Sequence, residues 1–171
     1  MVILGIDPGY GTVGFGVVES LGGNKIRPIE YGVIQTPKED SLPKRLKIIA
    51  DGFDYIIDKY RPEAVAIEEL FFQNNQKTAI AVAEARGVIL LAARKRGVSI
   101  SEYTPLQVKQ SVVGYGRAEK QQVMAMTASI LGLGKIKLDD TADALALAVC
   151  HAHCGTSRIQ DFYNGKKTRL V

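Results

Sequence analysis

The sequence predicts an α/β fold built on one mixed five-stranded sheet, in which three antiparallel strands are continued by two parallel strands and helices cover both faces. Three observations support this prediction. Apolar runs broken by short turns near the N-terminus are typical of an antiparallel meander. Residues 64–68 form an unbroken apolar run that ends in an acid, as in a strand buried on both faces. Strand, helix and strand then follow one another over residues 64–103, which indicates a right-handed crossover between parallel strands.

The N-terminal elements are marked by turns and by residue spacing. Three strand candidates lie at residues 2–7, 12–19 and 29–35, and a Gly-Gly-Asn turn at 22–24 separates the last two. Residues 43–60 place apolar side chains at helical spacing, and the Arg61-Pro62 pair that follows ends the element. We therefore expect a three-stranded meander followed by a first helix.

The second half of the chain alternates helices with strands. After the strand at 64–68, we expect a helix at 76–96 and a further strand at 98–103, which follows the break at Gly97. Two more helices are predicted at 117–131 and 139–154. The last of these begins with acids, which favour a helix N-terminus.

Length and composition fit a single folded domain. The chain has 171 residues, of which 46% are hydrophobic and 23% are charged. We expect one domain over residues 1–156 and a flexible basic tail over residues 157–171, where apolar periodicity is lacking. Neither a signal peptide nor a membrane-length apolar run is recognised, so the cytoplasm is the expected compartment. A net charge of +4 fits a polyanionic partner but does not establish one.

Four acids far apart in the chain form a candidate metal site. Asp7 and Glu68 each end a predicted buried strand, and parallel neighbours would bring both carboxylates to one rim of the sheet. Asp140 and Asp143 are three residues apart and share one face of the last helix. Carboxylates gathered in this way repel one another unless cations compensate them. Hard oxygen ligands suit Mg²⁺, for which Mn²⁺ can substitute. We therefore expect two such ions to support phosphodiester hydrolysis by in-line attack of metal-activated water.

Each acid also has a plain structural interpretation. Asp7 lies in a good turn sequence, Glu68 could be a surface acid, and Asp140 could only cap a helix. The glycine-rich segment 5–11 is also similar to the phosphate-binding hairpin of actin-like ATPases and sugar kinases. A nucleotide-binding lobe is therefore an alternative, although that architecture normally needs two such lobes.

Taken together, the motifs resemble the bacterial RuvC family of Holliday-junction resolvases, in the ribonuclease H-like superfamily, over nearly the whole chain. The stretches that carry the resemblance are, in order, GIDPG at 5–9, AIEELFF at 66–72, ARGV at 85–88, QVKQSVVGYGRAEK at 107–120 and DDTADALALA at 139–148. No single stretch would suffice. The resemblance implies a Mg²⁺-dependent endonuclease with a ribonuclease H-like fold, which nicks two strands of like polarity in four-way junction DNA.

The resemblance also implies residue roles. The four catalytic acids of the family match Asp7, Glu68, Asp140 and Asp143, which leaves Glu69 and Asp139 as bystanders. Phe71 matches an aromatic that stacks on an unpaired base near the junction centre, although packing against the core is an alternative for it. Lys109 and Lys120 match lysines near the scissile phosphate. Arg117 lies between them, where either a DNA contact or a plain surface position fits.

The helix at 76–96 predicts a homodimer. Its sequence is apolar almost all round, so one face packs on the sheet and the other needs a cover, either from the same subunit or from a second copy. The resemblance favours the second copy, and it also implies the branch-migration proteins RuvA and RuvB as partners. A catalytically inactive junction-binding protein remains an alternative.

The segment Cys-His-Ala-His-Cys at 150–154 contains residue types that bind zinc. On a helix, only side chains three or four residues apart converge, and a tetrahedral site needs four ligands. We therefore interpret Cys150, His151, His153 and Cys154 as a structural helix end.

Overall fold

The predicted five-stranded mixed sheet is confirmed in the computed structural model, which describes residues 1–69 and 76–154. The strand order is β3-β2-β1-β4-β5. The antiparallel meander consists of β1 (Val2–Asp7), β2 (Thr12–Gly22) and β3 (Lys25–Gln35). The parallel strands β4 (Ala64–Glu68) and β5 (Ser99–Tyr103) continue the sheet from β1.

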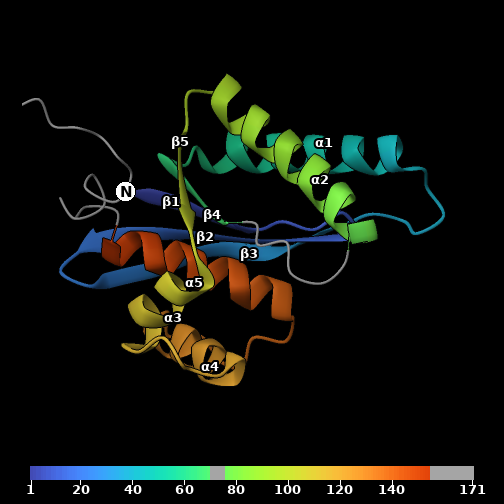
Figure 1. Ribbon diagram of the computed structural model, residues 1–171. Coiled ribbons are helices and arrows are strands. Elements are labelled where there is room, and N and C mark those ends of the chain that lie inside the picture. The colour runs from blue at the N-terminus through green and yellow to red at the C-terminus, as the bar shows by residue number, and fades with distance from the viewer. Residues whose placement is uncertain (70–75, 155–171) are drawn as a thin grey trace, which may run out of the picture.

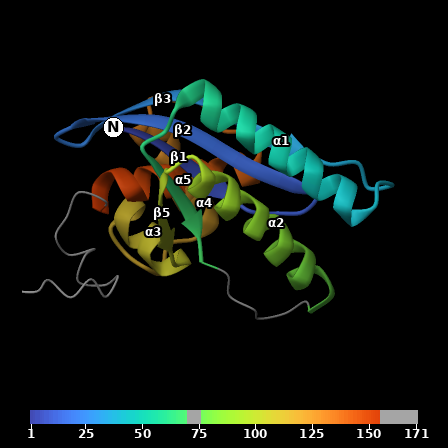
Figure 2. The ribbon, with the colours of Figure 1, turned by 90° about the horizontal axis from the view of Figure 1, so that it is seen from above.

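Helices cover both faces of this sheet (Figures 1 and 2). One face is covered by α1 (Leu42–Tyr60) and α2 (Gln76–Lys95). The opposite face is covered by α5 (Asp139–Cys154), and α3 (Pro105–Val113) and α4 (Lys120–Ile130) lie on the outer side of α5 (Figure 1). None of the described helices is long and apolar enough to cross a membrane.

The alternation of side chains along β1 divides the interior into two cores. Leu4 and Ile6 are fully buried in the core beneath α1 and α2, together with Phe53 and Ile89. Ile3 points to the other face and joins the core formed with α3, α4 and α5. Strand β1 is therefore packed on both faces, and its C-terminal end is held firmly in place.

Three glycines bring α5 unusually close to the sheet. A Cβ atom at Gly5 would lie 1.9 Å from the carbonyl oxygen of Ala144, and one at Gly14 would lie 2.0 Å from that of Asp140. A Cβ at Gly16 would meet the side chain of Leu145 at 2.7 Å. Any larger residue on this stripe of β1 and β2 would hold the helix away.

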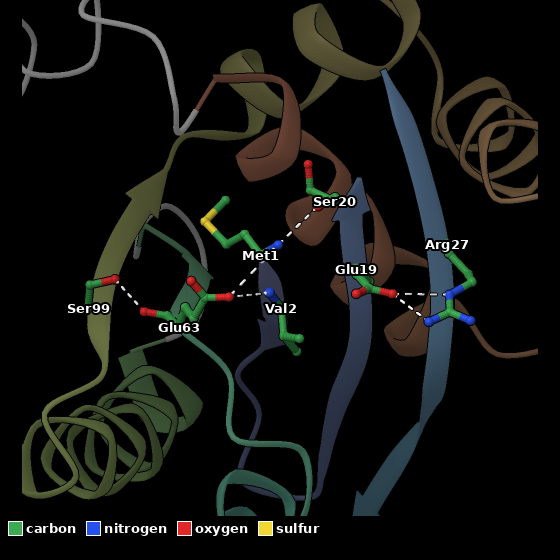
Figure 3. A network of polar contacts seen from close by, with 7 residues as sticks. All are labelled: Met1, Val2, Glu19, Ser20, Arg27, Glu63 and Ser99. Carbon is green, nitrogen blue, oxygen red and sulfur yellow. Dashed lines mark hydrogen bonds and ion pairs between the residues drawn. The ribbon is translucent and has the colours of Figure 1, made fainter. Parts of the chain in front are cut away.

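Polar contacts fix the N-terminal end of β1 against its neighbours (Figure 3). The Met1 ammonium donates to the carbonyl of Ser20 at 3.0 Å, and the backbone N–H of Val2 donates to Glu63 Oε1 at 2.9 Å. Ser99 Oγ donates to the carbonyl of Glu63 at 2.8 Å, which ties β5 to the same point. These contacts hold the start of β1 beside the residues that precede β4 and begin β5.

Helix α3 is absent from the sequence-based expectation, although its end signals are present. Thr104 and Gln107 form a reciprocal capping box, and Pro105 follows at the first helical position. Gly114, with a φ of 95°, ends the helix. Helix α4 begins at Lys120, three residues later than the predicted residue 117, because Glu119 caps it in a second box with Gln122.

Candidate active site

The ends of two neighbouring parallel strands bring Asp7 and Glu68 to the same edge of the sheet. Strand β1 ends at Asp7 and β4 ends at Glu68. In the parallel register, Ile6 pairs with Ile67, so the next residue of each strand is one of the two acids. This arrangement follows from the equal extension of two buried strands beyond the same anchored end.

The close contact between α5 and the glycine stripe adds the second pair of acids. Gly14 pairs with Asp7 in the β1–β2 ladder, and the backbone of Asp140 packs directly on Gly14. Asp140 is thereby fixed next to the end of β1. Asp143 follows three residues later on the same face of the helix.

The electrostatics of Asp7 reflect all four acids. The pKa of Asp7 is raised from 3.8 to about 7, mainly by burial and then, in decreasing order, by the negative charges of Asp143, Glu68 and Asp140. The positive charge of Lys120 acts in the opposite direction and lowers it. The pKa of Glu68 is also raised, first by burial and then by the charge of Asp143. The carboxylates therefore influence one another strongly, and the most buried of them holds its proton near neutral pH.

Lys120 supplies a positive charge to this cluster. Its ammonium lies 2.9 Å from Asp143 Oδ2 and 3.3 Å from Asp139 Oδ2. Partial burial lowers the pKa of Lys120, but the hydrogen bonds to the two aspartates outweigh this effect and raise it overall. Lys120 is thus a permanent cation next to the carboxylates.

A cavity of about 280 Å³ opens beside the cluster, between α3, α4 and α5. Its charged lining consists of Glu68, Lys109, Lys120 and Asp143, and apolar residues such as Val108 and Leu147 form much of the rest. Two of the acids and both lysines from the sequence analysis therefore share one cavity. Acids next to cations fit a phosphodiester, whose oxygens are negatively charged.

The chemistry of the donor set fits hard divalent cations. The four acids supply carboxylate oxygens, and a cation would relieve the repulsion that raises the pKa of Asp7. Within residues 1–69 and 76–154, no three His, Cys, Asp or Glu side chains are already arranged to hold a metal ion. Asp143 pairs with Lys120 in this structure, so the side chains would have to turn to close around an ion.

Other residues from the sequence analysis lie apart from this cavity or outside the described chain. Arg117 is exposed on the connection between α3 and α4. Phe71 lies outside the described residues, as does the tail over 157–171. Glu69 is exposed and donates its backbone N–H to Tyr103. Asp139, regarded as a bystander, contacts Lys120, which the sequence alone could not indicate.

The Cys-His segment at the end of α5 makes hydrogen bonds inside the fold. The Tyr103 hydroxyl lies 2.7 Å from His151 Nδ1, and His153 Nδ1 lies 3.1 Å from the carbonyl of Ser111. Burial lowers the pKa of His151, which favours its neutral form. The two histidines therefore face β5 and α3 separately, in agreement with a structural helix end.

The exposed face of α2 carries large apolar side chains. Ala85 and Ile89 are fully buried against the core, whereas Ile80 is 67% exposed and Leu91 is 57% exposed. The predicted helix, apolar almost all round, therefore has one face that this subunit leaves uncovered.

Comparisons with known proteins agree with these features. The family model described as crossover junction endodeoxyribonuclease RuvC matches residues 3–151. A protein with that name from Alkaliphilus oremlandii is 53% identical over 156 residues, which cover 91% of this chain and 94% of the relative. One from Caldanaerobacter subterraneus is 56% identical over 154 residues, covering 90% of this chain and 93% of the relative.

Solved structures agree as well. The structure described as T. thermophilus RuvC in complex with Holliday junction substrate superimposes with a TM-score of 0.85 at 40% identity, covering 90% of this chain and 93% of that one. A yeast mitochondrial Holliday junction resolvase shares the fold at a TM-score of 0.63 and 16% identity, covering 88% of this chain and 78% of that one.

Proposed function

The chain belongs to the RuvC family of crossover junction endodeoxyribonucleases and is a Holliday-junction-resolving endonuclease, and we propose that it cuts DNA with two Mg²⁺ ions held by Asp7, Glu68, Asp140 and Asp143. The observation that carries the proposal is the raised pKa of Asp7 beside three other carboxylates. An acid cluster of this kind is costly in a folded protein unless cations bind to it. Nucleases of this family are metal-dependent, and the carboxylate donor set favours Mg²⁺ or Mn²⁺ among biological metals.

Each group of residues has a proposed part in the reaction. Two ions at the carboxylates would activate the attacking water and stabilise the leaving oxygen. Asp7 and Glu68 stand on the rigid sheet and set the position of the site, whereas Asp140 and Asp143 approach it from α5. Lys109 and Lys120 would hold the scissile phosphate in the cavity that they line. Phe71 and Arg117 remain proposed DNA contacts through the resemblance alone.

We propose a homodimer formed through α2. Ile80 and Leu91 lie eleven residues apart on the helix, which is about three turns, so they share one face. Packing this face against its symmetry mate would bury both side chains and place two active sites on one molecule. Two sites suit a substrate with two equivalent strands to cut. The partners RuvA and RuvB and the cytoplasmic location remain predictions.

The decisive experiment is incubation with a synthetic four-way junction and Mg²⁺, with linear duplex of the same sequence as the control substrate. We expect paired nicks in two strands of like polarity in the junction and none in the duplex. Asp7→Asn, Glu68→Gln and Asp143→Asn should each keep junction binding but lose cutting. The matched control is Glu69→Gln, which removes an adjacent exposed carboxylate and should cut normally.

The outcomes separate the competing interpretations. Equal loss in Glu68→Gln and Glu69→Gln would contradict the assignment of the first glutamate. Junction binding without cutting by the unaltered protein, in Mg²⁺ or Mn²⁺, would support the inactive junction-binding alternative.

A further inference from the structure

Three cavities follow one another away from the catalytic carboxylates, and neighbouring cavities share a lysine. The catalytic cavity is lined by Lys120, which also lines a second cavity of about 590 Å³ between α4 and the connection to α5. Lys135 lines this second cavity and also a third one of about 300 Å³, which Lys137 and Tyr31 complete at the edge of the sheet. We call this series of cavities the lysine track. It extends from the reaction site toward β3.

The connection between α4 and α5 is built to present these lysines. Gly132, with a φ of 63°, turns the chain after α4, and the backbone N–H of Leu133 donates to the carbonyl of Ala128 at 2.9 Å. Ile136 is only 8% exposed, so it anchors the segment in the core. Lys135 and Lys137 are the residues on either side of this anchor, and both are exposed. The anchor holds their backbone in place while their side chains reach solvent.

The charges of Lys135 and Lys137 are available to a ligand. Within residues 1–69 and 76–154, neither lysine forms an ion pair with a carboxylate. One acid, Asp139, lines the second cavity, but its carboxylate contacts the ammonium of Lys120 at 3.3 Å. The track is therefore positive beyond the catalytic acids, and a negatively charged partner is the complementary occupant.

We infer that the lysine track binds the sugar-phosphate backbone of the DNA arm next to the cut, with Lys135 and Lys137 contacting phosphates that follow the scissile one. The inference rests on the proposed function, because it takes the scissile phosphate to lie at Lys120. Each DNA strand carries a phosphate about every 3.4 Å along the helix axis, so a strand leaving Lys120 must present further charges within a short distance. The track provides cations along one direction from that point. DNA is the favoured occupant because the strand that is cut at Lys120 continues directly into the track, whereas an acidic protein segment would have no such connection to the active site.

The experiment compares Lys135→Gln/Lys137→Gln with the unaltered protein in binding to a four-way junction without divalent metal, from 50 to 200 mM salt. Each phosphate contact contributes about 0.9 to the slope of log affinity against log salt concentration. Loss of two contacts should lower the slope by about 1.8, so the affinity of the unaltered protein should fall about 12-fold more than that of the variant over this range. The matched control is Lys25→Gln/Lys59→Gln, which removes the same charge from exposed positions near the opposite end of the sheet. Its slope should stay close to that of the unaltered protein.

A second measurement locates the contact on the DNA. Junctions that carry one neutral methylphosphonate near the cut should bind the unaltered protein more weakly at particular linkages, and the Lys135→Gln/Lys137→Gln variant should be insensitive to those same linkages. An unchanged salt slope, or a decrease equal to that of the control variant, would overturn the inference. If the unaltered protein fails to bind junctions at all, the proposed function itself fails.

Discussion

The close backbone contact between Gly14 and the start of α5 gives a quantitative prediction for Gly14→Ala. A Cβ at this position would lie 2.0 Å from the carbonyl oxygen of Asp140, whereas ordinary contacts begin at about 3.4 Å. The start of α5 must therefore move by about 1 Å or more, because neither atom belongs to a flexible side chain. A displacement of this size is beyond the roughly 0.5 Å tolerance of a catalytic site and can cost about 100-fold in rate.

The same substitution should leave the protein folded. Overpacking of this kind costs about 1–3 kcal/mol, which is less than the roughly 5–15 kcal/mol that stabilises a typical domain. The assay is single-turnover cleavage of a four-way junction at saturating Mg²⁺, with the melting temperature measured in parallel. Gly52→Ala is the control, since its Cβ would meet only the side chain of Ile34, at 3.0 Å or more, and it should cut at the normal rate. A folded Gly14→Ala protein with the normal rate would refute the idea that the glycine stripe positions the acids.

Three further predictions concern charge, packing and assembly. Without metal, Asp7→Asn should be more stable than the unaltered protein at pH 8, by at most about 4 kcal/mol, because the pKa of Asp7 is about 7 in the folded protein against 3.8 in the unfolded chain, so the unaltered protein loses stability as pH rises through that window. Denaturant titrations at pH 4 and pH 8 measure the difference in unfolding free energy, and an equal difference at both pH values would contradict the prediction. Tyr103→Phe should lower stability by about 1–3 kcal/mol, because the buried ring of His151 loses its partner, and urea unfolding is the check. Leu91→Glu should convert a dimer into a monomer in sedimentation analysis, whereas Leu21→Glu, equally exposed on the β2–β3 hairpin, should not.

The strand-end acids could be predicted from sequence because two independent signals coincide in them. The segments VILGID and AVAIE are apolar runs that end in an acid, and a buried strand can place such a residue only at its end. The parallel pairing of β1 with β4 is only assumed from sequence, and the structure supplies it. Sequence alone could therefore locate Asp7 and Glu68, although it could not tell how deeply Asp7 is buried.

The remaining features depend on distances between elements, which no local pattern contains. Gly5 and Gly14 read as turn or strand glycines in the sequence, and their role as a seat for α5 appears only when the helix is placed on them. Helix α3 is short, and only one of its two capping residues, Gln107, lies within the motif at 107–120, whereas Thr104 precedes that motif. The contact between Asp139 and Lys120 likewise requires the packing of α4 against α5.

Lys120 and the proton of Asp7 together explain how the acid cluster can exist before metal binds. Asp7 keeps its proton near neutral pH, and Lys120 offsets the charge of Asp143 at 2.9 Å. Two Mg²⁺ ions would have to displace both, so their binding should release a proton and free the Lys120 ammonium from Asp143. Asp139, 3.3 Å from that ammonium, would keep Lys120 beside the site after the exchange. The lysine would then be free to face the phosphate at the point where the lysine track begins.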